Sequence, residues 1–389
     1  MLWIWKSFLK IIKNYNVIFT ESYLDFSSLF KICKKINQFP RFHYEFQKKI
    51  LSNTILKDRE NLKLNIDSNN EFENLIKNLF FKYLPKSYLE SFSNILLYGI
   101  KNNIKCKKIC TAIGHLHNDT FNIWSAYKVK NGTKLYVSQH GGSLRPKTTG
   151  DFDHQIKISD KFITWHKEYN SKHIRLTPNK LIRIKNNSYK YKKNKFLTII
   201  GFEAFMYTHR AQSTLPGACM PIEFADCVEI YTKLKSSIKK NVKYRYADYS
   251  ENEGWFNTKQ RLKDKFGKNV ICQSKSMLDS FKKSKMLICK YPQTTFAEAM
   301  ISNIPTILVL NKNYWHFDSN FLKVIEELKN TKIIFEEVKN ATDHVNFYWN
   351  NLDEWWLSKK TLKAREDFFD MCCKHSNNWA EDWKNFLIS

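Results

Sequence analysis

A histidine followed by two glycines is the first feature of this sequence that could do chemistry. In YVSQHGG (residues 136–142), an apolar run ends at Gln139 and is followed by His140, Gly141 and Gly142. A histidine can take a proton from a hydroxyl near neutral pH, and glycines let the backbone turn and approach a ligand closely. His140 is therefore a candidate general base, and Gln139 and the two glycines are candidate cleft residues. The alternative is a histidine with a purely structural role.

A carboxylate in the same stretch, Asp153, is a second candidate for the base or a nucleophile. It lies in DFD (151–153), which superficially resembles a metal-binding Asp-x-Asp motif. That motif should directly end an apolar strand, whereas Lys-Thr-Thr-Gly precedes it here, so we expect neither a metal nor a cofactor. The sequence also lacks G-x-S-x-G and G-x-x-x-x-G-K-[ST], which argues against a serine hydrolase of that type and a P-loop enzyme.

The strongest local signal is CKYPQTTFAEAMISNIPTILV (289–309). A predicted strand ends at Tyr291, and a Pro-Gln-Thr-Thr turn opens a helix that Thr294 or Thr295 could cap. Free N–H groups at a helix start favour phosphate, and Glu298, one turn later, could accept a hydrogen bond from a ribose or sugar hydroxyl. The alternative is an ordinary capped helix with a solvated Glu. The predicted nucleotide site consists of Tyr291, Gln293, Thr294, Thr295 and Glu298.

Arginine is scarce in this chain, which has 55 Lys and only 9 Arg. Two of the nine fall beside predicted strand ends: EAFMYTHRAQ carries His209 and Arg210, and YRYADYSENEGW carries Arg245 and Asp248. The guanidinium fork suits a diphosphate or a carboxylate, so we take Arg210 and Arg245 as phosphate-binding candidates and His209 and Asp248 as further cleft candidates. The alternative is that these arginines form ordinary surface ion pairs.

The elements that must position these side chains alternate between strands and helices. Residues 14–95 read as mainly helical, and 184–195 read as a linker. This alternation is typical of parallel α/β domains, whose ligands gather beyond the carboxyl ends of the strands. In the first half we expect strands at 109–114, 134–142 and 160–165 and a helix at 118–130. In the second half we expect strands at 196–202, 242–247, 269–274, 285–291 and 305–311, and helices at 221–240, 257–266, 276–284 and 294–302.

The length of 389 residues suits two domains, and 43% hydrophobic residues suffice for two cores. We predict an α/β fold in which two Rossmann-like domains face each other across a cleft, with helical segments at both ends of the chain. The predicted boundaries are 1–190 for an N-terminal α/β domain with a helical lead-in, 195–325 for a C-terminal Rossmann-like domain that contains the predicted nucleotide site, and 326–389 for helices that pack back across both.

The formal charge of +27 invites a nucleic-acid partner, but the lysines are spread along the chain amid many Asn and Ile. We therefore expect no nucleic acid, and favour an anionic membrane surface or a phosphorylated substrate. The nine Cys show no C-x-x-C, which suits reduced thiols in a cytoplasmic protein. Residues 2–13 mix Leu, Trp and Phe with Lys, so this segment is either a peripheral membrane contact or a helix packed on its own domain.

Three passages together resemble a family of bacterial transferases from O-antigen and other surface-polysaccharide gene clusters. They are QHGG with the following DHQIKISDKFITW, then YRYADYSENEGW, then YPQTTFAEAMISNIPTILVLNKNYWHFDS. The resemblance spans roughly residues 110–325 and implies a glycosyltransferase of GT-B architecture. It implies that Thr294, Thr295 and Glu298 hold the nucleotide, that Arg210 and Arg245 hold its phosphate, and that His140 faces the reaction centre.

This resemblance predicts transfer of a sugar from a nucleotide sugar to a glycan or lipid-linked glycan hydroxyl, with no metal required. The QHGG segment is also similar to the His-Gly element of glycerophosphate transferases that build teichoic acids. A CDP-glycerol-type phosphotransferase and a sugar-nucleotide epimerase of the same fold therefore stay open. The alternative from another class is a basic nucleic-acid-binding module.

Overall fold

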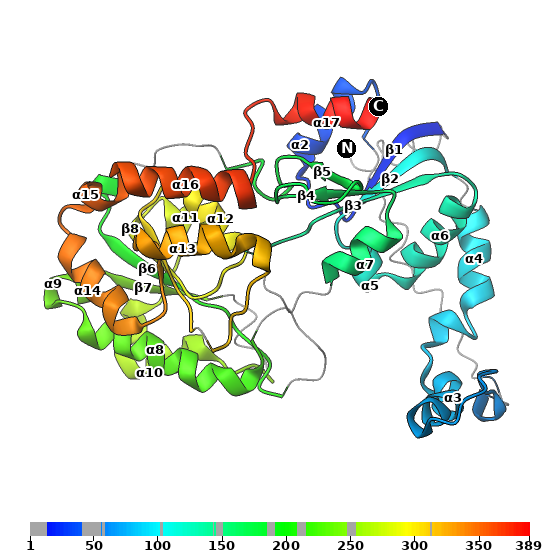
Figure 1. Cartoon of the computed structure of the whole chain (residues 1–389), viewed down its shortest axis with the longest axis horizontal. Helices are drawn as coiled ribbons and strands as arrows, with labels where there is room; N and C mark the ends of the chain where they lie inside the picture. Colours follow the sequence, from blue (N-terminus) through cyan, green and yellow to red (C-terminus); the bar gives the residue numbers. More distant parts are fainter. Residues whose placement is uncertain are drawn as a thin grey trace. The chain divides into compact units, whose positions relative to one another are not determined.

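The computed structural model describes residues 14–40, 56, 59–101, 104–142, 144, 151–184, 191–207, 215–246, 254–311 and 313–389. Contacts divide the chain into two compact units. The first comprises Met1–His140, Gln155–Ile163 and Ala380–Ser389, and the second comprises Gly141–His154 and Thr164–Trp379. The described strands form two sheets of five strands each. Figure 1 shows how the helices surround them.

The first sheet has the strand order β1-β2-β3-β4-β5, which follows the order of the chain. Neighbours from β1 to β4 pair in parallel. The expectation that residues 14–95 are mainly helical is wrong at its start: Val17, Ile18 and Phe19 are buried in β1, and burial of such apolar side chains favours a strand. The strands are β1 (Asn14–Thr20), β2 (Lys105–Thr111), β3 (Lys134–Ser138), β4 (Lys161–Thr164) and β5 (His173–Arg175).

Helices cover both faces of the first sheet, with α2 and α17 on one face and α5, α6 and α7 on the other (Figure 1). The predicted helix at 118–130 is confirmed as α6, and the Asn118 side chain caps it by accepting from the Phe121 N–H at 3.0 Å. The helices are α2 (Phe26–Lys35), α3 (Glu71–Tyr83), α4 (Phe92–Lys101), α5 (Gly114–His117), α6 (Asp119–Lys130), α7 (Asp151–Ile158) and α17 (Trp379–Ile388).

The last helix, α17, returns to the first unit. Trp383 is fully buried with its ring 6.4 Å from that of Phe19 on β1, and Lys108 on β2 donates to the Leu387 carbonyl oxygen at 2.7 Å. The predicted boundaries differ from the division by contacts. That division groups residues 164–379, which include β5 of the first sheet, with the second unit, and of the predicted C-terminal helices it assigns only the last ten residues to the first unit.

The second sheet has the order β10-β9-β8-β6-β7, with every pair parallel. The predicted strand at 269–274 is wrong: the chain makes a 3-10 turn, Lys268–Val270, and then a single parallel bridge from Ile271 to Tyr244 on β7. The sequence analysis missed β10, which has only two residues. The strands are β6 (Phe196–Ile200), β7 (Val242–Arg245), β8 (Ser284–Cys289), β9 (Thr306–Val309) and β10 (Ile334–Phe335).

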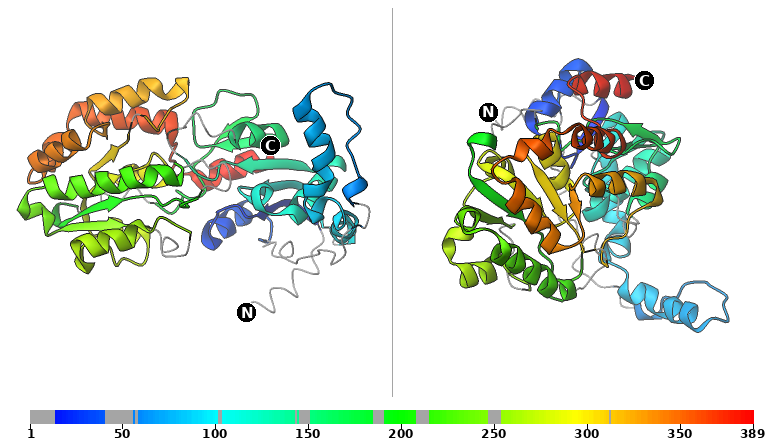
Figure 2. Two further views of the ribbon diagram at one scale, coloured as in Figure 1. Left: turned by 90° about the horizontal axis from the view of Figure 1, so that it is seen from below. Right: turned by 60° about the vertical axis from the view of Figure 1, so that its left-hand side comes forward.

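Two helical layers enclose this sheet, as Figures 1 and 2 show from three sides. Phe296 on α12 meets Phe368 on α16 at 5.4 Å between ring centroids, and Tyr231 on α8 stacks on Phe266 of α10 at 4.2 Å on the opposite face. The predicted helix at 221–240 ends early, because Leu234 adopts an extended conformation. The helices are α8 (Met220–Lys233), α9 (Ser236–Lys239), α10 (Thr258–Phe266), α11 (Met277–Phe281), α12 (Thr294–Ile301), α13 (Leu322–Asn330), α14 (Val338–Tyr348), α15 (Leu352–Trp356) and α16 (Lys359–Cys372).

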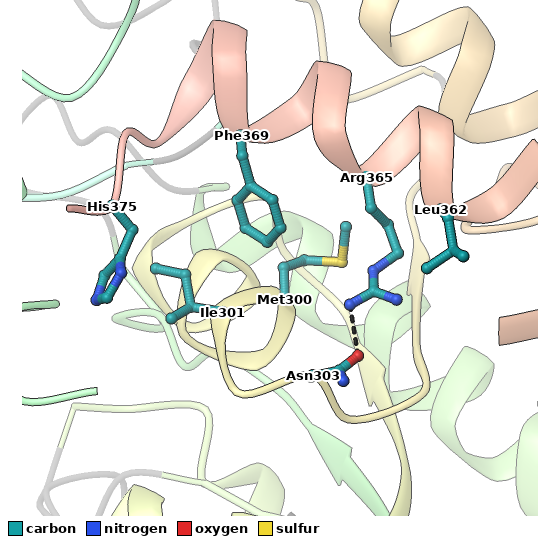
Figure 3. Close-up of a pocket in the computed structure, with 7 residues that line it drawn as sticks. All are labelled: Met300, Ile301, Asn303, Leu362, Arg365, Phe369 and His375. Atoms are coloured by element: carbon teal, nitrogen blue, oxygen red, sulfur yellow. Dashed lines mark hydrogen bonds between the residues drawn. The ribbon is translucent and has the colours of Figure 1, made fainter. Parts of the chain in front are cut away.

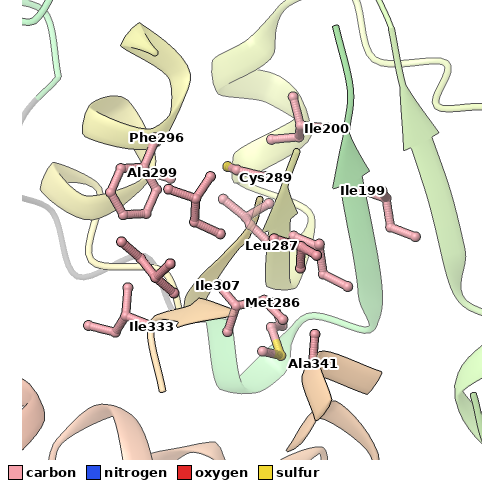
Figure 4. Close-up of a cluster of buried hydrophobic side chains, with 14 of the residues drawn as sticks. Ile199, Ile200, Met286, Leu287, Cys289, Phe296, Ala299, Ile307, Ile333 and Ala341 are labelled. Carbon is pink, nitrogen blue, oxygen red and sulfur yellow. The ribbon is translucent and has the colours of Figure 1, made fainter. Parts of the chain in front are cut away.

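The core of the second unit lies between these layers and is densely apolar (Figure 4). Met286, Leu287, Ile288 and Cys289 of β8 are all fully buried, which requires helices on both faces of the sheet. Burying one such leucine contributes about 2 kcal/mol. This continuous apolar strand holds the loop that follows it in a fixed position.

In the part of the chain that the structure describes, no helix is long and apolar enough to cross a membrane. The predicted membrane-contact segment, residues 2–13, lies outside the described residues, so its role stays a prediction.

Candidate active site

The second sheet reverses its direction of growth between β6 and β8. With the Ile271 bridge beyond β7, the order corresponds to the 3-2-1-4-5-6 arrangement of dinucleotide-binding folds, whose ligands bind where the strand order reverses. The Lys290 N–H donates to the Ile200 carbonyl oxygen at 3.0 Å and so joins the ends of the two central strands. The predicted segment YPQTT begins directly after this bond.

The start of α12 differs from the prediction in its cap. Thr294 and Thr295 do not cap the helix: Gln293 occupies the cap position without a side-chain capping hydrogen bond, and the helix begins at Thr294. The Thr295 hydroxyl instead shares a hydrogen bond of 2.8 Å with the Tyr291 hydroxyl. A helix start without a side-chain cap suits an external anion, because its first N–H groups point out of the helix.

The two glycines after His140 meet this helix start. The Gly142 N–H donates to the Thr294 hydroxyl oxygen at 3.3 Å. A Cβ added to Gly141 would lie 3.0 Å from the same oxygen, and Gly142 has φ +96°, a conformation that L residues rarely adopt. The two glycines of QHGG and the YPQTT segment therefore lie together in the second unit, a proximity that spacing in the sequence could not show.

Glu298 lies one turn into α12 and is partly buried. Burial raises the pKa of its carboxyl to about 7, although the positive charges of Lys180 and Arg183 oppose that rise. Burial also lowers the pKa of Lys180, with Glu298 acting in the opposite direction. Glu298 thus changes its charge near neutral pH, beside two basic side chains. The sequence analysis missed Lys180 and Arg183, and only the scarcity of arginine could have drawn attention to the latter.

A buried ion cluster, which the sequence analysis also missed, lies beside the same loop. Lys290 has a side chain only 1% exposed, and its Nζ lies 2.7 Å from Asp226 Oδ2 and 3.3 Å from Glu223 Oε2 on α8. Burial raises the pKa of Glu223, while Lys290 opposes this. Asp226 also lines a polar cavity of about 280 Å³ at the carboxyl ends of β9 and β10, together with Asn311 and Glu336. The cluster fixes α8 against the end of β8.

Arg245 occupies the last position of β7, but its side chain points to a backbone acceptor. Its Nη1 donates to the carbonyl oxygen of Ser274 in the segment after the Ile271 bridge. Its predicted role as a phosphate ligand stays a prediction. The candidates Arg210, His209 and Asp248 lie outside the described residues.

The two candidate catalytic residues lie in different settings. His140 is partly buried and directly follows Gln139, whose N–H donates to the Ile163 carbonyl oxygen of β4 at 2.8 Å within the first unit. Asp153 is exposed and lies in helix α7, not in a loop before a strand. Among the described residues, no group of three His, Cys, Asp or Glu side chains could hold a metal ion.

Two α/β units, the second with a reversed strand order, define the class: this is an α/β protein with two sheets of five strands and surrounding helices, as predicted. The chain belongs to the LIC12162 transferase family, whose model, described as "LIC12162 family transferase", matches residues 3–387. This match confirms that the chain belongs to a transferase family, and the predicted enzyme class, a transferase, is therefore confirmed.

Solved structures with a similar fold share little sequence with the chain. The wall teichoic acid polymerase TagF is 11% identical, with 97% of this chain and 88% of that chain covered and a TM-score of 0.46. The E. coli trehalose-6-phosphate protein bound with UDP-2-fluoro glucose is 9% identical, with 96% of this chain and 98% of that chain covered and a TM-score of 0.49. MurG from Acinetobacter baumannii is 9% identical, with 96% of this chain and 99% of that chain covered and a TM-score of 0.47. None of the curated proteins matches this sequence. At these scores, the similarity carries no argument about substrate.

Proposed function

We propose that this transferase is a glycosyltransferase that moves a sugar from a nucleotide-activated donor to a hydroxyl of a surface-polysaccharide acceptor of O-antigen or capsule type. The observation that carries the proposal is the meeting of Gly142 with Thr294 at the start of α12, one turn before Glu298. A helix start supplies N–H groups to a diphosphate, and a carboxylate in the next turn accepts hydrogen bonds from ribose or sugar hydroxyls.

In the proposed reaction, the acceptor oxygen forms a bond to the anomeric carbon while the bond from that carbon to the diphosphate oxygen breaks. His140 takes the proton from the acceptor hydroxyl, and the nucleoside diphosphate leaves with the bonding electrons. The helix start and Arg245 would stabilise the negative charge that develops on the leaving group. No metal is required in this scheme, because N–H groups and cations can neutralise that charge.

The first test of the proposal is donor binding. We expect one nucleotide sugar, from a set with UDP, GDP, CDP and CMP carriers and including CDP-glycerol, to raise the melting temperature of the full chain. Titration calorimetry should then show that Thr294→Val and Glu298→Gln each weaken that donor about tenfold or more, since a hydrogen bond to a charged group contributes about 1.5–3 kcal/mol.

Matched controls lie on the same unit. Thr232→Val on α8 and Glu326→Gln on α13 change the same residue types at exposed positions, and should leave donor affinity unchanged. If Thr294→Val and Glu298→Gln bind the donor as tightly as these controls, the proposed site is wrong. Selective binding of CDP-glycerol would instead favour the phosphotransferase.

A further inference from the structure

A cavity of about 290 Å³ lies between the far end of α12 and helix α16, within the second unit. Figure 3 shows Arg365, Phe369 and Leu362 reaching into it from α16, with Arg365 and His375 toward opposite ends and apolar side chains between them. The volume is near the lower limit of small-molecule sites. The lining residues are Met300, Ile301, Asn303, Leu362, Arg365, Phe369 and His375.

Arg365 carries a buried positive charge whose protein partners are neutral. The residue is 7% exposed, and its guanidinium donates to Asn303 Oδ1 at 2.5 Å and to the Trp356 carbonyl oxygen at 3.4 Å. Its guanidinium carbon also lies 3.9 Å from the centre of the Trp356 ring. Among the described residues, no carboxylate contributes to the electrostatic environment of this guanidinium. Burial lowers the pKa of Arg365 to about 10, and Tyr191 opposes this shift only in part.

One donor of this guanidinium is left over. Arg365 Nε is buried and has no hydrogen-bond acceptor among the described residues. Nε and the adjacent Nη form the side of the guanidinium fork that carboxylates and phosphates accept in a bidentate manner. A buried donor without an acceptor costs about 1–3 kcal/mol. Nε is covered by neighbouring side chains and Nη2 already donates to Asn303, so an anion that displaces this cover gains both a hydrogen bond and an ion pair.

We propose that this cavity binds a small organic anion: a carboxylate or phosphate monoester that pairs with Arg365 and carries an apolar body between Met300, Ile301 and Phe369. The apolar lining rejects a bare inorganic ion, because such an ion would lose its hydration without filling that space. His375 closes the opposite end, held by a hydrogen bond of 3.0 Å from its Nε2 to the Ile184 carbonyl oxygen. The proposal does not depend on the identity of the transferred group.

The test is calorimetric titration of the full chain with phenyl phosphate, and separately with benzoate. Benzyl alcohol serves as the neutral probe and inorganic phosphate as the probe without an apolar body. We expect at least one of the two organic anions to bind with a dissociation constant of about 1 mM or tighter, and the other two probes to bind at least about tenfold more weakly. Inorganic phosphate binding as well as both organic anions would overturn the proposal, as would no saturable binding of either anion.

Substitutions of Leu362, an exposed residue that lines the cavity, test whether the anion binds there without disturbing the hydrophobic core of the second unit. Leu362 lines the cavity but is 40% exposed, so Leu362→Glu adds a repelling charge where the fold tolerates it. Leu362→Glu should weaken the bound anion about tenfold, and the neutral control Leu362→Gln should change its affinity less than twofold. Thr294→Val, at the other end of α12, should leave the affinity unchanged. Equal affinity in Leu362→Glu and Leu362→Gln would place the anion elsewhere and refute the proposal.

Discussion

The two sheets of this transferase have the same number of parallel strands but differ in strand order. In the first sheet the order follows the chain from β1 to β5, whereas the second begins in its interior with β6, adds β7 on one side and then β8 on the other. Right-handed crossovers then send the helices after β6 and β8 to opposite faces of the sheet. The loops that leave these two strands diverge, and a ligand can enter between them.

The difference in strand order predicts that the two units have different roles. The described part of the second unit contains the reversal, the helix start without a side-chain cap and Glu298, so it should bind the donor. The first sheet contributes His140 just beyond the end of β3, where no reversal occurs among the described strands. Binding and proton transfer should therefore be separable by substitution.

The largest expected effect is on turnover in His140→Gln. Loss of a general base typically costs about 100-fold to 10,000-fold in rate, so we expect about a 1,000-fold loss of transfer. Donor affinity, measured by calorimetry in the same preparation, should stay within twofold of the original. Asp153→Asn is the matched comparison, because Asp153 is the other candidate base. If Asp153→Asn abolishes transfer while His140→Gln does not, Asp153 is the general base and His140 is not.

The next effect is on stability, in Lys290→Met. Removing the lysine leaves the buried Glu223 and the partly buried Asp226 without their cation, which should destabilise the second unit by about 3 kcal/mol. In the first unit, Lys35→Met breaks the Lys35–Glu381 pair, but both of those side chains are about 40% exposed, and the loss should be below about 1 kcal/mol.

Hydrogen exchange of peptides from each unit reports the two losses separately. Exchange of β8 should accelerate in Lys290→Met and stay unchanged in Lys35→Met. Adding Glu223→Gln to Lys290→Met should recover part of the loss, because one uncompensated carboxylate is removed. If Lys290→Met and Lys35→Met lose the same amount of stability, the buried ion pairs of Lys290 stabilise the protein no more than the exposed Lys35–Glu381 pair does.

The sequence predicted the strands that are formed by short, continuous apolar runs. The run KMLIC became β8 because an apolar segment of this length, bounded by turn residues, is buried on both faces of a parallel sheet. β1 was missed because its seven residues follow a Lys-rich segment and precede a polar helical region, which dominated the pattern. The strand expected at 269–274 is reduced to one bridge, since a 3-10 turn takes up its first residues.

The candidate site was predictable where the chain is locally continuous, and not where it depends on contacts between distant segments. YPQTT and Glu298 follow from one strand and one helix. Lys180 and Arg183 lie more than a hundred positions before Glu298, and no local pattern links them to it. Lys290 is one of 55 lysines, so only burial distinguishes it from the others.

The smallest of these effects is the pH dependence of stability in Glu298→Gln. The pKa of Glu298 is about 7 in the folded chain against an ordinary value of 4.5, so between these values the folded state binds more protons than the unfolded state. The original chain therefore loses stability as the pH rises from about 4.5 to 7. Glutamine does not titrate, so the stability of Glu298→Gln relative to the original chain should rise by about 2.5 kcal/mol between pH 5 and pH 8.

Thermal melts at pH 5 and pH 8 measure this difference, with the exposed Glu326→Gln as the control that should show no change between the two pH values. Because the same substitution should weaken donor binding, a gain in stability together with a loss of affinity would show that the buried carboxylate is retained for its ligand. If Glu298→Gln is less stable at pH 8, the attraction of Lys180 and Arg183 outweighs burial. The prediction that the second unit binds the donor would then depend on the strand reversal and the start of α12, without support from the pKa of Glu298.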